Sequence, residues 1–158
     1  MKNRDENVEP EGLRQHRLRT FYGVGSMILK TERLLLRNYK TKDWEQVHIY
    51  GSDPDFSKFE FWGPNKLEDT QKFIVEMVQQ SKSSPRFKFD FAICLKENEL
   101  LIGGCGIRRE TELSHVANIG WAINPKFQSK GFATEAARAL IEYGFQKLKL
   151  SIIYATCD

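Results

Sequence analysis

A short run of residues combines glycine, a cation and small side chains where a strand-like stretch gives way to a helix. The run from Gln128 to Thr134 reads QSKGFAT, and an amphipathic helix follows it. The first-turn N–H groups of a helix lack intrahelical partners and lie at the positive end of the helix dipole. Gly131 lets the backbone approach an anion or adopt a positive φ. Ala133 keeps the entrance open and Lys130 adds charge, so the run predicts a cradle for a phosphate or pyrophosphate.

The spacing excludes the two commonest phosphate-binding signatures. The P-loop pattern needs a lysine after its last glycine, but Phe132 follows Gly131. The dinucleotide pattern GxGxxG is absent as well. A second glycine run, GGCG at 103–106, lies inside a strand-like stretch and indicates a bulge or tight packing. What remains is Q-x-x-G-x-A between a strand and a helix.

Composition limits the classes of protein and of site. The chain has 158 residues, of which 41% are hydrophobic and 28% charged, as expected of one domain with a buried core. A net charge of +3 without a basic block argues against nucleic acid. No apolar run suits a membrane span or a signal peptide, so we expect a cytoplasmic protein without a membrane partner. Cys94, Cys105 and Cys157 are expected to be reduced thiols, the first two as buried small hydrophobes, and no histidine spacing suggests a metal site.

The elements that must position the glycine loop are expected in the order strand, two helices, three strands, helix, strand. We expect strands at 34–37, 89–96, 100–109, 115–124 and 151–157, the last one buried. Helices are expected at 42–50, 65–80 (with a capping box of Asn65 and Glu68) and 133–148. This order favours the α/β (α+β) class, with a mixed sheet flanked by helices. Residues 1–26 show no period, and we interpret them as a disordered leader or a cloning remnant before a domain at 27–158.

On these residues the chain resembles the GNAT superfamily of N-acetyltransferases, whose acetyl-CoA loop reads [Q/R]-x-x-G-x-[G/A]. TERLLLR, FWGPN with EDTQKFI, FAICLKENELLIGGCGI and IGWAINPKFQSKGFATEAARALIEYGF resemble the ribosomal-protein-alanine acetyltransferase (RimJ/RimL)-like branch, from Ile28 to Asp158. The resemblance implies a mixed, mostly antiparallel sheet flanked by helices. It also implies that the chain is truncated, lacking the C-terminal helix and strands that follow YATCD in relatives and the tyrosine acid they often carry. A homodimer would cover the strand edge left open.

The resemblance further implies that acetyl-CoA is the cosubstrate, bound between the strand ending at Asn124 and the strand from Ser151. Backbone N–H groups would hold the pyrophosphate, the strand edge would pair with the pantetheine, and the Ile123 N–H would polarise the thioester carbonyl. A primary amine, from a peptide N-terminus or a small molecule, would attack directly. The implied cofactor-binding residues are Trp121, Ile123, Asn124, Gln128, Ser129, Lys130, Gly131, Phe132, Ala133 and Thr134.

The groups that would move protons are not fixed by the sequence. Relatives often place a glutamate where this chain has Asn118, which cannot act as a base. Glu60, Glu112 and His115 are the alternatives, beside a water relay, and each also fits an ordinary surface residue.

Two further alternatives stay open. Phe59, Phe61 and Trp62 either line an acceptor pocket or pack a loop, and Trp121 is expected to be in the core. The function is either an acetyl-CoA-dependent N-acetyltransferase or a non-catalytic acyl-CoA-binding or interaction module.

Overall fold

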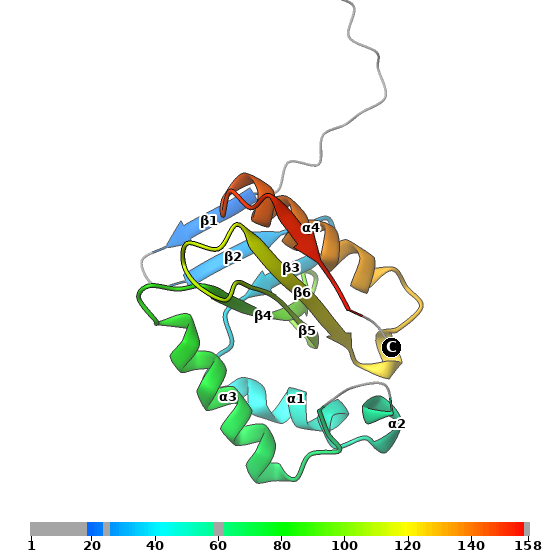
Figure 1. The fold of residues 1–158 in the computed structure, drawn as a ribbon. Helices are drawn as coiled ribbons and strands as arrows, with labels where there is room; N and C mark the ends of the chain where they lie inside the picture. Colours follow the sequence, from blue (N-terminus) through cyan, green and yellow to red (C-terminus); the bar gives the residue numbers. More distant parts are fainter. Residues whose placement is uncertain (1–18, 24–25, 59–61, 157–158) are drawn as a thin grey trace, which may run out of the picture.

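The computed structural model describes residues 19–23, 26–58 and 62–156 of the chain (Figure 1). The strands are β1 (Arg19–Gly23), β2 (Ser26–Lys30), β3 (Leu34–Arg37), β4 (Lys88–Leu95), β5 (Leu101–Arg108), β6 (Val116–Ile123) and β7 (Ile152–Tyr154). The α-helices are α1 (Trp44–Gly51), α2 (Pro54–Ser57), α3 (Leu67–Ser81) and α4 (Phe132–Gln146), and 3-10 turns lie at Thr41–Asp43 and Pro125–Phe127.

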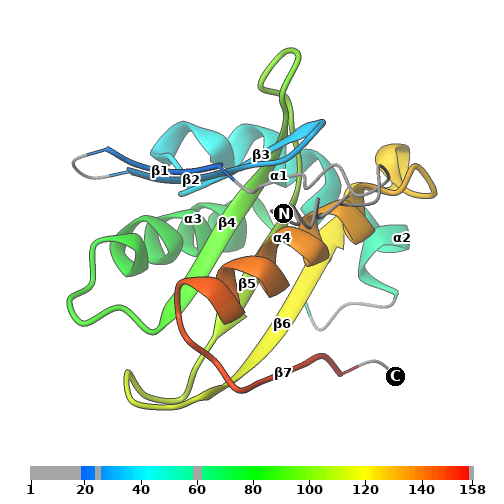
Figure 2. The same ribbon diagram turned by 90° about the horizontal axis from the view of Figure 1, so that it is seen from above.

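The described strands form one sheet in the order β1-β2-β3-β4-β5-β6-β7. Every neighbouring pair is antiparallel except β6 and β7, which run parallel because α4 connects them. Helix α4 covers one face of the sheet, and α1 and α3 cover the other (Figure 2). The prediction of a mixed, mostly antiparallel sheet flanked by helices is confirmed.

Two apolar cores hold the layers together, one on each face. Leu140 of α4 is fully buried against the face that presents Phe91 and Ile107. On the other face Ile74 of α3 and Val47 of α1 are buried. Each such side chain contributes about 1.5–3 kcal/mol through its removal from water.

Three details differ from the expectations. Residues 19–23, assigned to the leader, form β1 and pair with β2, whereas residues 1–18 lie outside the described part. Helix α3 is capped one residue later than predicted, because the Lys66 N–H donates to the Asp69 carboxylate (3.0 Å). The prediction of a buried final strand is wrong: Ile152 and Tyr154 of β7 are about half exposed, since β7 lies at the edge of the sheet.

The cysteine prediction is confirmed for the two thiols that the structure describes. Cys94 of β4 and Cys105 of β5 are free and buried. Burial raises the pKa of Cys94 to about 11, and burial also raises the pKa of Cys105. Both thiols therefore stay protonated and behave as small core residues. Cys157 lies outside the described residues.

Candidate active site

Small residues occupy the centre of the sheet on the face that α1 and α3 cover. In the register, Asp90 of β4 lies opposite Gly106 of β5, which lies opposite Gly120 of β6. Two positions along, the next row on this face is Ala92, Gly104 and Ala122. Because β5 contributes no side chain in these two rows, other side chains reach over its backbone: a Cβ at Gly104 would clash with the Tyr39 hydroxyl, and one at Gly106 with the Asp90 carboxylate.

The glycines of the run GGCG have two different structural roles. Gly103 packs tightly, since a Cβ there would clash with the Ala122 carbonyl oxygen, and a register bulge lies one step away at Ile93. That much agrees with the predicted bulge or tight packing. Gly104, in contrast, lines a cavity of about 850 Å³, a role that the sequence did not predict. This volume is within the range of small-molecule sites.

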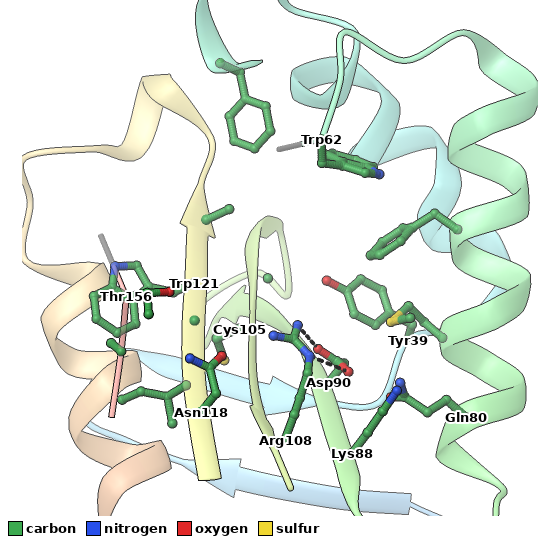
Figure 3. A pocket seen from close by; sticks show the side chains of 18 of the residues that line it. Tyr39, Trp62, Gln80, Lys88, Asp90, Cys105, Arg108, Asn118, Trp121 and Thr156 are labelled. Carbon is green, nitrogen blue, oxygen red and sulfur yellow. Dashed lines mark hydrogen bonds and ion pairs between the residues drawn. The ribbon is translucent and has the colours of Figure 1, made fainter. Parts of the chain in front are cut away.

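The wall of the cavity that faces the sheet is aromatic. Phe56 and Trp62 pack edge to face (6.1 Å between ring centroids), as do Tyr39 and Phe73 (5.6 Å). Burial raises the pKa of Tyr39 well above the usual phenol range, so its hydroxyl stays protonated. The sequence left open whether the aromatic loop lines an acceptor pocket or packs internally. Trp62 does both, since it packs against neighbouring aromatic rings and lines the cavity (Figure 3). Phe59 and Phe61 lie outside the described residues.

The floor of the cavity carries an ion pair. Asp90 is 5% exposed, and its carboxylate accepts two hydrogen bonds from the Arg108 guanidinium, one from Nε at 3.2 Å and one from Nη2 (Figure 3). Among the described residues that line the cavity, Asp90 is the one carboxylate. Lys88 and Asn118 flank Arg108 in the same cross-strand row. The sequence analysis missed this pair, because only the strand register brings residues 90 and 108 together.

Strands β6 and β7 separate at one end of the cavity. They pair only from Val116 with Ile152 to Asn118 with Tyr154, and β6 continues to Ile123 without β7 beside it. The Asn124 N–H donates to the Ile102 carbonyl of β5 (2.8 Å). Backbone groups alternate along an extended strand, so the Ile123 N–H faces the other edge, where β7 has ended.

Trp121 lies on this open stretch of β6. The prediction that it is a core residue is wrong, since its side chain is 41% exposed and lines the cavity. Trp121 does lie on the face of β6 opposite Gly120 and Ala122, because successive residues of a strand point to opposite faces. Its exposure follows from the separation of the strands, because β7 does not extend far enough to cover it.

The loop between β6 and α4 is held in an uncommon backbone conformation. Gly131 is the N-cap of α4 with φ 79° and ψ 4°, and Ser129 has φ 59°. No described side chain caps this N-terminus. The Gln128 amide Nε2 donates to the Ile123 carbonyl (3.0 Å), so this side chain fastens the loop to the end of β6. The Lys130 ammonium lies over the Phe127 ring, 5.4 Å from its centroid.

A clamp from the start of β3 fixes the first turn of α4. Glu135 accepts hydrogen bonds from the Thr31 hydroxyl (2.6 Å), the Arg33 N–H (2.8 Å) and the Arg33 Nε (2.7 Å). Burial acts to raise the pKa of Glu135, but these hydrogen bonds outweigh it and leave the pKa below its usual value. The Arg33 Nη1 also donates to the Lys130 carbonyl (3.0 Å). These contacts span about a hundred residues, so no local pattern in the sequence could indicate them.

The structure does not gather the predicted proton acceptors at the open edge. His115 precedes β6 at its far end, eight residues from Ile123 and so roughly 26 Å away along an extended strand. Glu112 lies in the same distant turn, where its carbonyl accepts from Arg109 (2.7 Å). Glu60 lies outside the described residues. Asn118 does line the cavity.

The described residues contain neither a membrane-spanning helix nor a metal-binding cluster. No helix within the described ranges is long and apolar enough to cross a bilayer. No group of three or more His, Cys, Asp or Glu side chains in the same ranges could hold a metal ion.

Comparison with known proteins places the chain in a family. Residues 33–158 match the Acetyltransferase (GNAT) domain. The uncharacterized N-acetyltransferase YnaD of Bacillus subtilis (strain 168) is 37% identical over 132 residues, which are 84% of this chain and 74% of YnaD. The crystal structure of a GNAT-family acetyltransferase from Bacillus anthracis matches with 38% identity and a TM-score of 0.71, over 83% of this chain and 74% of that one.

A more distant structure shares the fold. The microcin C7 self-immunity acetyltransferase MccE, solved with acetyl-CoA and AMP, is 21% identical with a TM-score of 0.67, over 80% of this chain and 71% of its own. The predicted truncation is not supported by these matches. Helix α4 and strand β7 are present, and the aligned residues are 74% of YnaD and 74% of the Bacillus anthracis protein. The family match over residues 33–158 and the identity to YnaD show that the chain belongs to the GNAT family of N-acetyltransferases.

Proposed function

We propose that the chain transfers the acetyl group of acetyl-CoA to a primary amine, by direct attack of the amine on the thioester carbonyl. The observation that carries the proposal is the open edge of β6, which leads directly into the uncapped N-terminus of α4. The extended pantetheine arm of acetyl-CoA needs a strand edge to pair with, and its pyrophosphate needs a helix N-terminus close to that edge. MccE, which has this fold, was solved with acetyl-CoA.

The loop residues fit a pyrophosphate. The N–H groups of Phe132, Ala133 and Thr134 belong to the first turn of α4, where no backbone acceptor is available within the helix. The left-handed conformations of Ser129 and Gly131 turn the chain sharply before this turn. We assign the pyrophosphate to residues 129–134 and the pantetheine amides to the backbone groups between Trp121 and Ile123 that face the open edge.

The roles of Gln128 and Lys130 are narrower than the resemblance implied. Gln128 supports the site indirectly, because its amide satisfies the Ile123 carbonyl. The Lys130 ammonium lies over the ring of Phe127, from where it contributes positive charge to the loop.

Acetyl transfer requires the protein to position the two reactants and to donate one hydrogen bond to the thioester carbonyl. A C–N bond forms, the C–S bond breaks, the amine loses a proton and the CoA thiolate gains one. The Ile123 N–H donates to the carbonyl oxygen as negative charge develops on it. Holding the amine and the thioester together in one cavity supplies most of the remaining acceleration. Glu60 and His115 stay predictions for the base, with His115 disfavoured by its distance from the open edge.

The test measures cofactor binding and product formation separately. Calorimetry measures the affinity for acetyl-CoA, and chromatography measures the CoA and acetylated amine formed from a panel of peptides and small amines. Binding together with product formation supports the proposal. Binding without any acetylated product would instead support the non-catalytic acyl-CoA-binding module, and absence of binding would contradict both.

A further inference from the structure

The charges that face the cavity are mostly positive. Among the described lining residues, Lys58, Lys88 and Arg108 are cationic and Asp90 is anionic. Lys58 is exposed and pairs with Asp55 (2.6 Å), and Asp90 is neutralised by Arg108. These two pairs leave Lys88 as the unbalanced charge among the described lining residues, so a polycationic acceptor would meet a like charge there.

Arg108 is held in a way that leaves one side of its guanidinium available. The hydrogen bonds to Asp90 use Nε and Nη2 and fix the plane of the fork. Nη1 lies over Gly120, since a Cβ added at Gly120 would be 3.7 Å from it, and no described residue accepts a hydrogen bond from Nη1. Arg108 Nη1 is thus a hydrogen-bond donor that faces the cavity above β6, the strand whose edge is open.

The ion pair requires a glycine at position 106. A Cβ on Gly106 would clash with the Asp90 carboxylate and come within 3.0 Å of Arg108 Nη2. The Arg108 side chain is nevertheless 44% exposed, so the cavity reaches it. A buried carboxylate that does nothing but orient a reachable arginine is typical of a binding site for a planar anion.

We propose that Arg108, positioned by Asp90, binds a carboxylate of the acceptor. The acceptor is then a small primary amine that also carries a carboxylate and an apolar body, and this inference rests on the proposed function. The aromatic wall of Tyr39, Trp62 and Phe73 receives the apolar body.

The spacing along β6 suits a molecule of this size. Gly120, below Arg108, and Ile123, whose N–H faces the open edge, are three residues apart, which is roughly 10 Å along an extended strand. A carboxylate at Arg108 and an amine beside the thioester would thus lie within roughly 10 Å of each other, a separation that one small acceptor can span.

The test uses acceptors that share an amine and an apolar body and differ in the carboxylate. One set is phenylalanine, phenylalaninamide and phenethylamine, and a second is leucine, leucinamide and isoamylamine. Rates of acetylated product are compared at equal concentrations of free amine. We expect kcat/KM to be at least tenfold higher for the carboxylate member of a set, with the difference mainly in KM.

Variants test whether Arg108 causes the preference. Arg108→Gln combined with Asp90→Asn, which avoids an unpaired buried carboxylate, should abolish the preference, so that kcat/KM for the carboxylate member and for the amide of a set agree within about threefold. Lys72→Gln, at an exposed lysine of α3 outside the cavity, removes the same charge and should keep the preference. Because the wild-type comparison stands alone, a variant that fails to fold does not remove the test.

Two results would overturn the inference in different ways. Equal or faster acetylation of the amines that lack a carboxylate would refute it. Acetylation of spermidine or peptides, but of neither phenylalanine nor leucine, would also refute it. Either result would leave the N-acetyltransferase function standing. Acetyl-CoA binding without acetylation of any amine would refute the proposed function and the inference together.

Discussion

Replacing Gly131 by alanine perturbs the loop at the residue that caps α4. Its φ of 79° and ψ of 4° lie in the left-handed region, where an alanine costs about 1–2 kcal/mol. The added Cβ would be 3.4 Å from Arg33 Nη2, the flexible end of a side chain, so the cost comes from the backbone rather than from a clash. Alanine also restricts the unfolded chain, which returns about 0.4–1 kcal/mol. The expected net loss in the free energy of unfolding is about 1 kcal/mol.

The same substitution should weaken cofactor binding more than it weakens the fold. The loop must keep its left-handed turn to present the N–H groups of the first turn of α4, and an alanine favours relaxation of that turn. We expect the Kd for CoA to rise at least tenfold, which corresponds to about 1.4 kcal/mol. Urea unfolding gives the stability and calorimetry gives the affinity.

A matched control separates the two effects. Ile74, on α3, is 1% exposed and packs in the cluster on the opposite face of the sheet from α4. Ile74→Val removes one buried methyl group and costs about 0.5–1.5 kcal/mol, close to the cost expected at Gly131. CoA affinity should be unchanged in this control. If Gly131→Ala loses stability but binds CoA as tightly as Ile74→Val does, the loop is not the pyrophosphate site.

Two further predictions follow from protonation and burial. Glu135→Gln should lower the free energy of unfolding by about 1–2 kcal/mol near pH 7, because it weakens charge-assisted hydrogen bonds that are partly exposed. The folded-state pKa of Glu135 is lowered, so its stabilisation is present above the usual carboxyl pKa and is lost as pH falls through the folded-state value. The gap between wild type and variant in urea unfolding should therefore close below about pH 4; a constant gap down to pH 3 would contradict this. In a Cys157→Ser background, Cys94 and Cys105 should resist a thiol reagent at pH 8 and react in urea; rapid labelling of the folded protein would show that these thiols are accessible.

The sequence predicts the loop at the start of α4 well, because the features involved are local. A left-handed glycine, the helix that follows and the strand that precedes it lie in one continuous segment, residues 116–146, and each has its own pattern. The order of elements from β3 to β7 could be predicted for the same reason. The strands β1 and β2, at one end of the sheet, were missed because a five-residue strand shows its period only when its partner is known.

The cavity could be predicted only in part. Gly104, Gly106 and Gly120 alternate with apolar residues, and this spacing of two is a signal for an unfilled face of a sheet. Their alignment across strands depends on the register, which also brings Asp90 to Arg108. The Arg33–Glu135 clamp joins segments about a hundred residues apart and could not be predicted from either of them.

The central claim is that acetyl-CoA lies along the open edge of β6, with its pyrophosphate at the N-terminus of α4. A titration of the ¹⁵N-labelled protein with CoA, followed by amide chemical shifts, tests this most directly. The account predicts the largest shifts at residues 129–134 and at Trp121 to Asn124, with small shifts in α3. Shifts centred on another part of the chain, or none at saturating CoA, would contradict it.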